Sequence, residues 1–583
     1  MKRTIFPILI VMICLVSLIQ AADFGYPVEG EPWYFIRAAF ADSAALSKGT
    51  WRVSQITVNG TRYRDFLLFQ EGEEVLGEDI QGQRPFEVKV RFAWKGNQAY
   101  EIQALLENAK TKKAVTLAQK LSSPALKGHW DPNWKNYLSL IVAEENGIER
   151  RGYPVQATIG IFANYLRSAD EIRVVKAERA GNDVAYTEIP SQAYDQVTWA
   201  DQKILSIEEK DDKTGKPIIR YHPTTSLSVA FLANLKPKEK ATYLIFYNNP
   251  GAPKPAYATD LKVVGAGEGQ PIGKTIENSF YKVTLNKKSG VIYEITEKTS
   301  KTLLEHKLET NGSIHWNPCL YSPPHTWTHT SDWENPPYVE VNGPVFYSIR
   351  ITAPLPFYPQ VLCSVTYHFY ANVPYILVQT TIDVNENMFV QALRNGEIVF
   401  NKKVFKNVAY KTTDGRVEAI DLNRTRMHPD HVIALRPDTP WVTFYNQDKG
   451  VAFANLYLDL TMTNVEGGEA SAEQPFIYIQ NGPWYYLARG LVYSFGTNNQ
   501  TRMLPVRKGS VYSERIAFYP FSFKKEQGYS VQADTLFNML QNPVSVLESI
   551  ETYAESPEGW VTPILTEPFE EGVDQAIGGK KKK

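Results

Sequence analysis

The sequence is poor in cysteine, in net charge and in long apolar runs. Three of its 583 residues are cysteine, and 62 Lys and Arg side chains balance 63 Asp and Glu to a net charge of −1. No basic stripe alternates with aromatic residues, which excludes the usual surface of a nucleic-acid-binding protein. Beyond the N-terminus, no stretch approaches the ~20 continuous apolar residues of a membrane helix. We therefore expect no nucleic-acid partner and no membrane span.

The N-terminus carries the pattern of a secretory signal. Lys2 and Arg3 precede the apolar run Ile5–Ile19, and Ala21 is a small residue in front of the expected cleavage site. We therefore predict that residues 1–21 are a signal peptide, cleaved after Ala21, and that the mature protein is secreted or periplasmic.

Two cysteines, Cys319 and Cys363, remain after this cleavage. An oxidising compartment permits a disulfide between them. Cys363 also lies in an apolar strand pattern, where a buried free thiol is common. The sequence leaves both alternatives open.

Aromatic residues are abundant, with 33 Tyr, 27 Phe and 12 Trp. Short alternating runs separated by turn signals recur along most of the chain, and only 533–540 and 544–550 show the spacing of short helices. A chain of this length exceeds what one hydrophobic core supports. The pattern predicts an all-β, multi-domain protein with short C-terminal helices.

Two hairpins are the clearest local predictions. Ile276–Ile295 alternates apolar and polar residues around a turn in which Gly290 suits a positive φ. Ser364–Val384 alternates in the same way around the turn Ala371–Pro374. Both hairpins resemble those of the large supersandwich of galactose-mutarotase-like domains, of the C-terminal domains of α-mannosidases and of several polysaccharide lyases. This resemblance covers about 270–530.

A second resemblance concerns the segment before it. NGIERRGYPVQATIGIF (146–162), followed by EIPSQAYD (188–195), resembles the N-terminal β-barrel segment of exo-acting rhamnogalacturonan-lyase-like proteins. It covers about a fifth of the chain and is a strand-and-turn pattern. The chain lacks the long helical repeat that forms the catalytic toroid of such enzymes. The resemblance therefore implies a secreted, carbohydrate-related protein and assigns no catalytic residue.

Together these patterns predict the domain order. The expected parts are a signal peptide (1–21), an accessory β-sandwich of carbohydrate-binding or spacer type (24–145), a second β-barrel or β-sandwich (146–265), a supersandwich (270–530), and short helices with a flexible tail (531–583).

The stretch His315–Trp333 is the first candidate for a functional site, because it concentrates His, Trp, Tyr and Asp residues. It shows no regular period, so we expect a long ordered loop. Trp rings stack on sugar rings, and His and Tyr can move protons. The alternative is a loop that packs its Trp rings on the core. The expected substrate-binding residues are His315, Trp316, Trp327 and Trp333, and the expected catalytic residues are Tyr321, His325 and His329.

His325 and His329 are four residues apart, the spacing of zinc ligands on a helix. Pro323 and Pro324 disfavour a helix here, and no Glu follows His325. The sequence therefore indicates no cofactor and no metal site, and a divalent metal is an open alternative.

The second candidate is the segment around Arg424, Arg426 and His428, which alternation would place on one side of an extended chain. Arg recognises a carboxylate through two parallel hydrogen bonds, so a uronate would be a natural partner. The alternative is a solvated strand end with ion pairs. Arg394, in a polar turn, and Tyr485 are further expected substrate-binding residues.

Elimination at a uronate needs a cation near the carboxylate, a base and an acid. Arg424 or Arg426, one of His325, His329 or His428, and Tyr321 or Tyr485 could supply these roles. The leading hypothesis is thus a polysaccharide lyase acting on an acidic poly- or oligosaccharide. A glycoside hydrolase would need two spaced carboxylates, and spacing favours no pair. A non-catalytic glycan-binding protein and a cell-surface structural protein are further alternatives, and the sequence leaves the oligomeric state open.

Overall fold

The computed structural model describes residues 22–25, 34–41, 45–63, 66–92, 94, 96–124, 130–162, 165–180, 183–199, 203–210, 213–215, 217–221, 224–304, 318–325, 327–422, 430–463, 471–480, 484–493, 503–526, 528–549 and 565–567. Within these residues the ordered elements are almost all antiparallel β-strands, which confirms the predicted all-β class. None of the described helices is long and apolar enough to cross a membrane. The predicted signal peptide lies outside the described residues.

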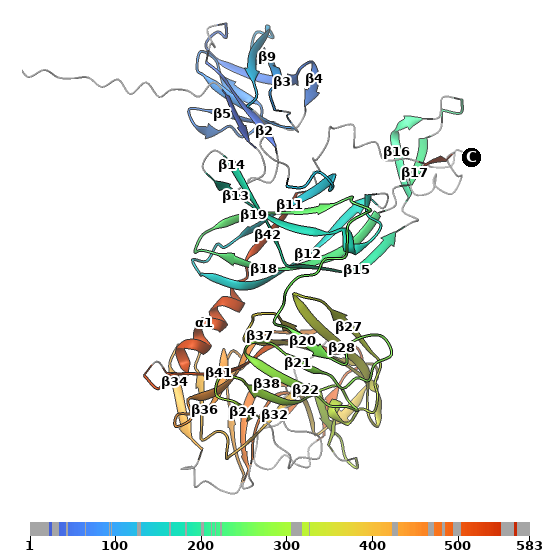
Figure 1. The fold of residues 1–583 in the computed structure, drawn as a ribbon, viewed down its shortest axis with the longest axis vertical. Coiled ribbons are helices and arrows are strands. Elements are labelled where there is room, and N and C mark those ends of the chain that lie inside the picture. Colours follow the sequence, from blue (N-terminus) through green and yellow to red (C-terminus); the bar gives the residue numbers. More distant parts are fainter. Residues whose placement is uncertain are drawn as a thin grey trace, which may run out of the picture.

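The N-terminal part is a sandwich of two small sheets (Figure 1). One runs β1 (Ala22–Gly25), β2 (Phe35–Phe40), β8 (Phe86–Arg91), β5 (Phe66–Gln70), β6 (Glu73–Glu74); the other runs β10 (Ala114–Ser122), β9 (Ala99–Asn108), β3 (Thr50–Val58), β4 (Thr61–Tyr63), with β7 (Asp79–Gln81) also on β3. Alternate residues of β8 and β9 point into one core that includes the fully buried Trp51.

The second part also builds its core from two main sheets. These are β14 (Asp183–Ile189), β13 (Arg173–Ala180), β19 (Lys240–Tyr247), β11 (Asn136–Ala143), β42 (Ser545–Ser549), and β12 (Arg150–Phe162), β18 (Thr224–Leu235), β15 (Ser191–Trp199). A smaller sheet holds β16 (Lys203–Lys210), β17 (Pro217–Tyr221) and β43 (Leu565–Glu567), and a 3₁₀ turn, η2 (Ala169–Glu171), precedes β13.

The strand β42 corrects one prediction, because 544–550 was expected to be a helix. Val142 of β11 pairs with Val546, and β42 thereby becomes the edge strand of the sheet. Val544 and Val546 pack on the core while Leu547 is 58% exposed. This alternation is that of a strand, and the partner that selects it is remote in sequence.

The third part is a large sandwich in which a nine-stranded sheet faces a six-stranded sheet across one core. The nine strands are β27 (Tyr338–Asn342), β28 (Phe346–Leu355), β29 (Tyr358–Tyr370), β30 (Ile376–Val384), β41 (Val511–Ser522), β37 (Val451–Thr463), β36 (Trp441–Asn446), β33 (Asn407–Lys411) and β34 (Val417–Asp421). The six are β26 (Thr328–His329), β25 (Pro318–Tyr321), β32 (Ala392–Asn401), β39 (Trp484–Tyr493), β38 (Ser471–Gln480) and β35 (Asp430–Ala434).

Five further strands contribute to the same core: β20 (Lys262–Val264), β21 (Thr275–Glu277), β22 (Tyr281–Leu285), β23 (Ile292–Glu297) and β24 (Thr302–Leu304). A small pair, β31 (Met388–Val390) and β40 (Leu504–Val506), completes the described strands. Both predicted hairpins are confirmed, as β22–β23 and β29–β30. Their apolar sets, such as Val365 and Phe369, are fully buried.

Polar bonds cross this core and tie its two sheets together. Arg489 of β39 pairs with Glu514 of β41 at 2.6 Å, and both side chains are at most 2% exposed. Asn395 of β32 accepts a hydrogen bond from Thr380 of β30 at 2.9 Å and donates to Glu514. The position of β32 is therefore fixed by buried contacts to two strands of the opposite sheet.

The other face of the nine-stranded sheet is covered by α1 (Ser530–Gln541), the one α-helix among the described residues, and by the second part of the chain (Figure 1). Ala533, Leu536 and Leu540 recur at helical spacing and pack against β36 and β37. The prediction of a helix over 533–540 is thus confirmed. Because apolar layers cover both faces, strands such as β37 are apolar on both sides.

Gly290 in the β22–β23 turn gives a stability prediction. Its φ is +75°, as expected from the sequence, and a Cβ atom there would lie 2.6 Å from the Cδ1 atoms of Ile272 and Ile351. Gly290→Ala therefore combines backbone strain with overpacking and should cost about 2–4 kcal/mol of unfolding free energy. Gly415→Ala is the control, since its φ is +87° with no atom within 4 Å. If denaturant unfolding shows the same loss of unfolding free energy in both variants, the packing contribution is refuted.

Candidate functional site

The stretch expected to be a long irregular loop is instead, over its described part, the edge of the six-stranded sheet. β25 and β26 pair with each other, and β25 pairs with β32. A short 3₁₀ turn, η3 (Thr330–Asp332), follows β26. The prediction of a loop without secondary structure is wrong here, because β32 offers a partner strand that the local sequence does not reveal. The predicted site residues His315, Trp316, Arg424, Arg426 and His428 lie outside the described residues.

Strand alternation divides the side chains of this edge between two faces. Leu320 and Leu393 point into the core, whereas Tyr321 and Arg394 point to the opposite face, which we call the outer face. The register shift between Asn395 and Glu397 adds one residue to β32 and returns Glu397 to the side of Arg394. Arg394 was expected in a polar turn, and the structure places it inside this bulged strand.

Aromatic rings hold the Arg394 guanidinium on the outer face. Its Cζ atom lies 4.1 Å from the centroid of the Trp327 ring and 5.0 Å from that of Phe476. Trp327 in turn stacks on Tyr321 with 4.9 Å between ring centroids. Arg394 Nη1 donates to Glu397 Oε2 at 2.8 Å. Three predicted site residues, Tyr321, Trp327 and Arg394, are thus brought together beside Glu397.

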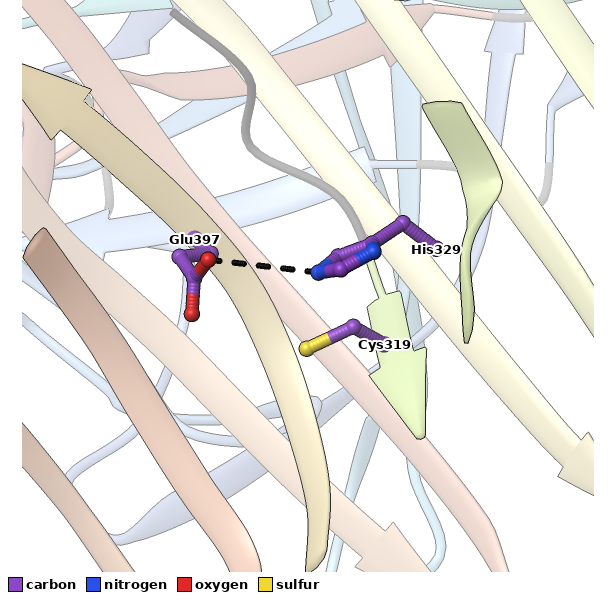
Figure 2. A group of neighbouring side chains, drawn as sticks. All are labelled: Cys319, His329 and Glu397. Carbon is purple, nitrogen blue, oxygen red and sulfur yellow. Dashed lines mark ion pairs between the residues drawn. The ribbon is translucent and has the colours of Figure 1, made fainter. Parts of the chain in front are cut away.

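Beside this group, Cys319, His329 and Glu397 converge from β25, β26 and β32 (Figure 2). Cys319 and His329 are direct partners in the antiparallel pairing, so their side chains share one face. The three ligand-type atoms all lie within 4.8 Å of one another, and His329 Nε2 is 3.9 Å from Glu397 Oε1. All three residues are buried, Cys319 completely. Such a set of thiol, imidazole and carboxylate groups can hold a transition metal.

The surroundings of His329 favour its charged form. Burial opposes that charge, but Asp332, Cys319 and Glu397 outweigh it and raise the pKa of His329 to about 10. Asp332 Oδ2 lies 3.7 Å from Nδ1 and accepts the backbone N–H of His329 at 2.8 Å. Without a metal, His329 is therefore an imidazolium at neutral pH. A protonated imidazole cannot accept a proton, and the expected role of His329 as a general base stays a prediction.

Two predicted substrate-binding residues are structural instead. Trp333 is 4% exposed, and its indole N–H donates to the carbonyl of Pro354 at 2.7 Å. Tyr485 is fully buried in the core between the two sheets, where burial raises its phenol pKa. Neither ring reaches the outer face, so their assignment to substrate binding is wrong.

His325 is exposed, four residues after Tyr321 in the sequence. Its ring stacks on Phe357 with 5.6 Å between centroids and meets the edge of Tyr358. The side chain of Phe357 is 72% exposed. Its φ is +65°, in the left-handed backbone region that is energetically unfavourable for a bulky residue. Phe389 is a second exposed ring, and its carbonyl accepts a hydrogen bond from Ser322. These rings present aromatic surface to solvent.

β26 and β35, the strand that follows the second candidate segment, lie at opposite edges of one sheet. His329 is in β26, and His431 is in β35, with four strands between them. Five inter-strand spacings of about 4.8 Å separate these edges by about 24 Å along the sheet. The described part of the second candidate segment, 430–431, therefore does not contact His329 directly.

Sequence reasoning missed Cys319, Glu397 and Phe357 as site residues. Cys319 was considered only for a disulfide, and the structure holds Cys319 and Cys363 as buried free thiols. Cys319 lies four residues before Pro323 and ten before His329, so a turn at the two prolines could have placed Cys319 opposite His329. No local signal marks Glu397, because only the bulge in β32 turns it outward.

Comparison with known proteins gives weak matches. No family model and no curated protein matches the chain. An alpha-mannosidase structure from Enterococcus faecalis is similar at 9% identity and a TM-score of 0.44, over 72% of this chain and 46% of that one. A glycosyl hydrolase family 38 protein from the same organism is similar at 10% identity and 0.42, over 75% and 49%. A galactose mutarotase-like protein from Lactobacillus casei is similar at 10% identity and 0.29, over 43% and 100%.

The chain thus spans about half the length of the two Enterococcus proteins. At TM-scores below 0.5 and identities of 9–10%, these likenesses establish neither the fold nor the activity of this chain. Its two-layer β architecture stands on its own strand pairing, and its function has to follow from the site.

Proposed function

We propose that this protein is an exported, carbohydrate-active protein that binds an acidic glycan on the outer face of the six-stranded sheet and eliminates at a uronate. The observation that carries the proposal is the position of Arg394, next to the Tyr321–Trp327 stack on the outer face. A guanidinium beside aromatic rings matches a negatively charged sugar.

Elimination assigns one role to each group. Arg394 pairs with the uronate carboxylate, and this makes the C5 proton more acidic. His325, which is exposed, removes that proton. The electron pair forms the C4–C5 double bond, the C4–O bond breaks, and the Tyr321 hydroxyl gives its proton to the departing oxygen. In this proposal Arg394, His325 and Tyr321 supply the cation, the base and the acid that the reaction requires.

The test is incubation of the full-length protein with a panel of uronate-containing polysaccharides, following the ultraviolet absorbance of the new conjugated double bond. Wild type should produce the signal, and His325→Ala should lower the rate about 10²–10⁴-fold. His325 is exposed, so this variant should fold normally. Arg394→Gln should lower the rate about 10²–10³-fold. Arg436→Gln, at an exposed arginine paired with Asp438, is the matched control and should leave the rate unchanged.

The absence of absorbance over the whole panel, or full turnover by His325→Ala, would exclude this mechanism. A second function, non-catalytic glycan binding, is favoured by the exposed rings of Phe357 and Phe389. It predicts measurable glycan affinity without elimination, and a weaker affinity in Phe357→Ala. Glycoside hydrolysis needs two carboxylates, and Asp332 and Glu397, which lie on either side of the His329 imidazole, are the pair for that alternative.

A further inference from the structure

We propose that Cys319, His329 and Glu397 bind one divalent transition-metal ion of the zinc class. This inference rests on the arrangement of the three side chains and is independent of the proposed glycan activity. Their ligand atoms lie within 4.8 Å of one another in the absence of an ion (Figure 2). In a tetrahedral zinc site, neighbouring ligand atoms are about 3.4–3.6 Å apart, given bond lengths of about 2.0–2.3 Å. A contraction of about 1 Å would thus form the site.

The backbone presents these ligands from a rigid sheet. Cys319 pairs with His329 on one side and with Arg394 on the other. The bulge in β32 brings Glu397 to the same face, and buried bonds from Asn395 to the opposite sheet hold that bulge in place. Ligands on strands need little ordering when an ion binds, so the loss of entropy is small.

Neighbouring groups orient each ligand toward a common point. Asp332 lies on the Nδ1 side of His329, so Nε2 faces Glu397. A carboxylate behind a metal-bound histidine is the usual way to fix its ring. Arg394 Nη1 engages Glu397 Oε2, and this leaves Oε1 on the side of His329 as a single ligand atom. Asp332 and Arg394 are therefore positioning residues for the metal.

The ligand set also selects the class of metal. Thiolate and imidazole favour zinc or cobalt over magnesium and calcium, which prefer oxygen ligands. Three protein ligands leave a fourth position for water or for an oxygen of a bound molecule. Binding requires the thiolate of Cys319 and the neutral imidazole of His329, so the protons that these groups release offset the charge of the ion.

The experiment is a titration of chelator-treated full-length protein with Co²⁺, whose spectrum reports its ligands. We expect one ion per chain, visible bands of tetrahedral intensity and a thiolate-to-cobalt band in the near ultraviolet. Cys319→Ser should abolish the thiolate band. Glu397→Gln should keep that band and weaken the affinity at least tenfold. Asp332→Asn should weaken the affinity about 10–100-fold through the histidine.

Cys363→Ala is the matched control, because it removes the other buried thiol of the mature chain. It should keep both the thiolate band and the affinity. Circular dichroism identifies any variant that does not fold. If Cys319→Ser does not fold, Glu397→Gln still tests the site. A folded wild type without cobalt bands, or an unchanged thiolate band in Cys319→Ser, would overturn the proposal. Neither result depends on glycan turnover.

Discussion

Arg489→Met should lower the unfolding free energy of the large sandwich by about 3–5 kcal/mol, because removing one partner of a buried ion pair leaves an uncompensated charge. Arg489 and Glu514 are 2% and 1% exposed, and the Arg489 guanidinium also lies 4.6 Å from the centroid of the Tyr457 ring. Burial already raises the pKa of Glu514 against the opposing effect of Arg489. Without the arginine that carboxyl must either take up a proton or remain charged in an apolar core.

This loss is measured by unfolding the full chain in denaturant and monitoring the transition of the large sandwich. Arg416→Met is the control, since the Arg416–Asp414 pair is exposed and should contribute at most about 1 kcal/mol. The double variant Arg489→Met with Glu514→Leu should recover much of the stability, because it removes both charges. A loss below about 1 kcal/mol in Arg489→Met would contradict a buried, unrelieved charge.

Glu144→Gln is the second substitution with a large expected effect, about 3 kcal/mol at neutral pH. The carboxyl of Glu144 accepts hydrogen bonds from the backbone N–H groups of Lys238, Asn146 and Gly147 and from Arg150. Burial raises the pKa of this carboxyl, but these hydrogen bonds outweigh burial and lower it to about 2. Arg150 also binds the carbonyls of Met539 and Asn542 at the end of α1.

The lowered pKa fixes the sign of the pH dependence. The folded value lies below the ordinary value of 4.5, so the stabilisation is complete above that pH and is lost as the pH falls through about 2. The thermal stability of wild type should therefore decrease as the pH falls from 4.5 to about 2. Glu144→Gln should already be less stable at neutral pH, and its stability should change less with acid. Glu149→Gln, at an exposed carboxyl paired with Arg151, is the control. Parallel pH profiles for wild type and Glu144→Gln would contradict this role.

How far the sequence could predict this structure depended on whether a signal was local. The β22–β23 and β29–β30 hairpins and the helix at 533–540 were predictable, because period and turn residues lie within one segment. The strand at Ser545–Ser549 was not predictable, because its five residues are compatible with both a helix and a strand. Pairing with β11, which is remote in sequence, selects the strand.

The candidate site shows the same limit. Arg394, Trp327 and Tyr321 were chosen by residue type and do meet. Trp333 and Tyr485 were chosen in the same way and face the core, because an aromatic residue does not reveal which side of its strand it occupies. Glu397 reaches the outer face only through an inserted residue in β32.

The edge strand β42 has a mechanical consequence for the whole molecule. The second part of the chain is built from 136–247 together with Ser545–Ser549, so the large sandwich is an insertion between two strands of one sheet. Both of its ends are anchored in that sheet, at β19 and at β42. A body with two tethers can pivot only about the line that joins them, whereas one on a single linker can turn freely. The outer face should therefore keep a nearly constant direction relative to the second part, and cutting the chain after α1 would release that restraint and strip an edge strand from the sheet.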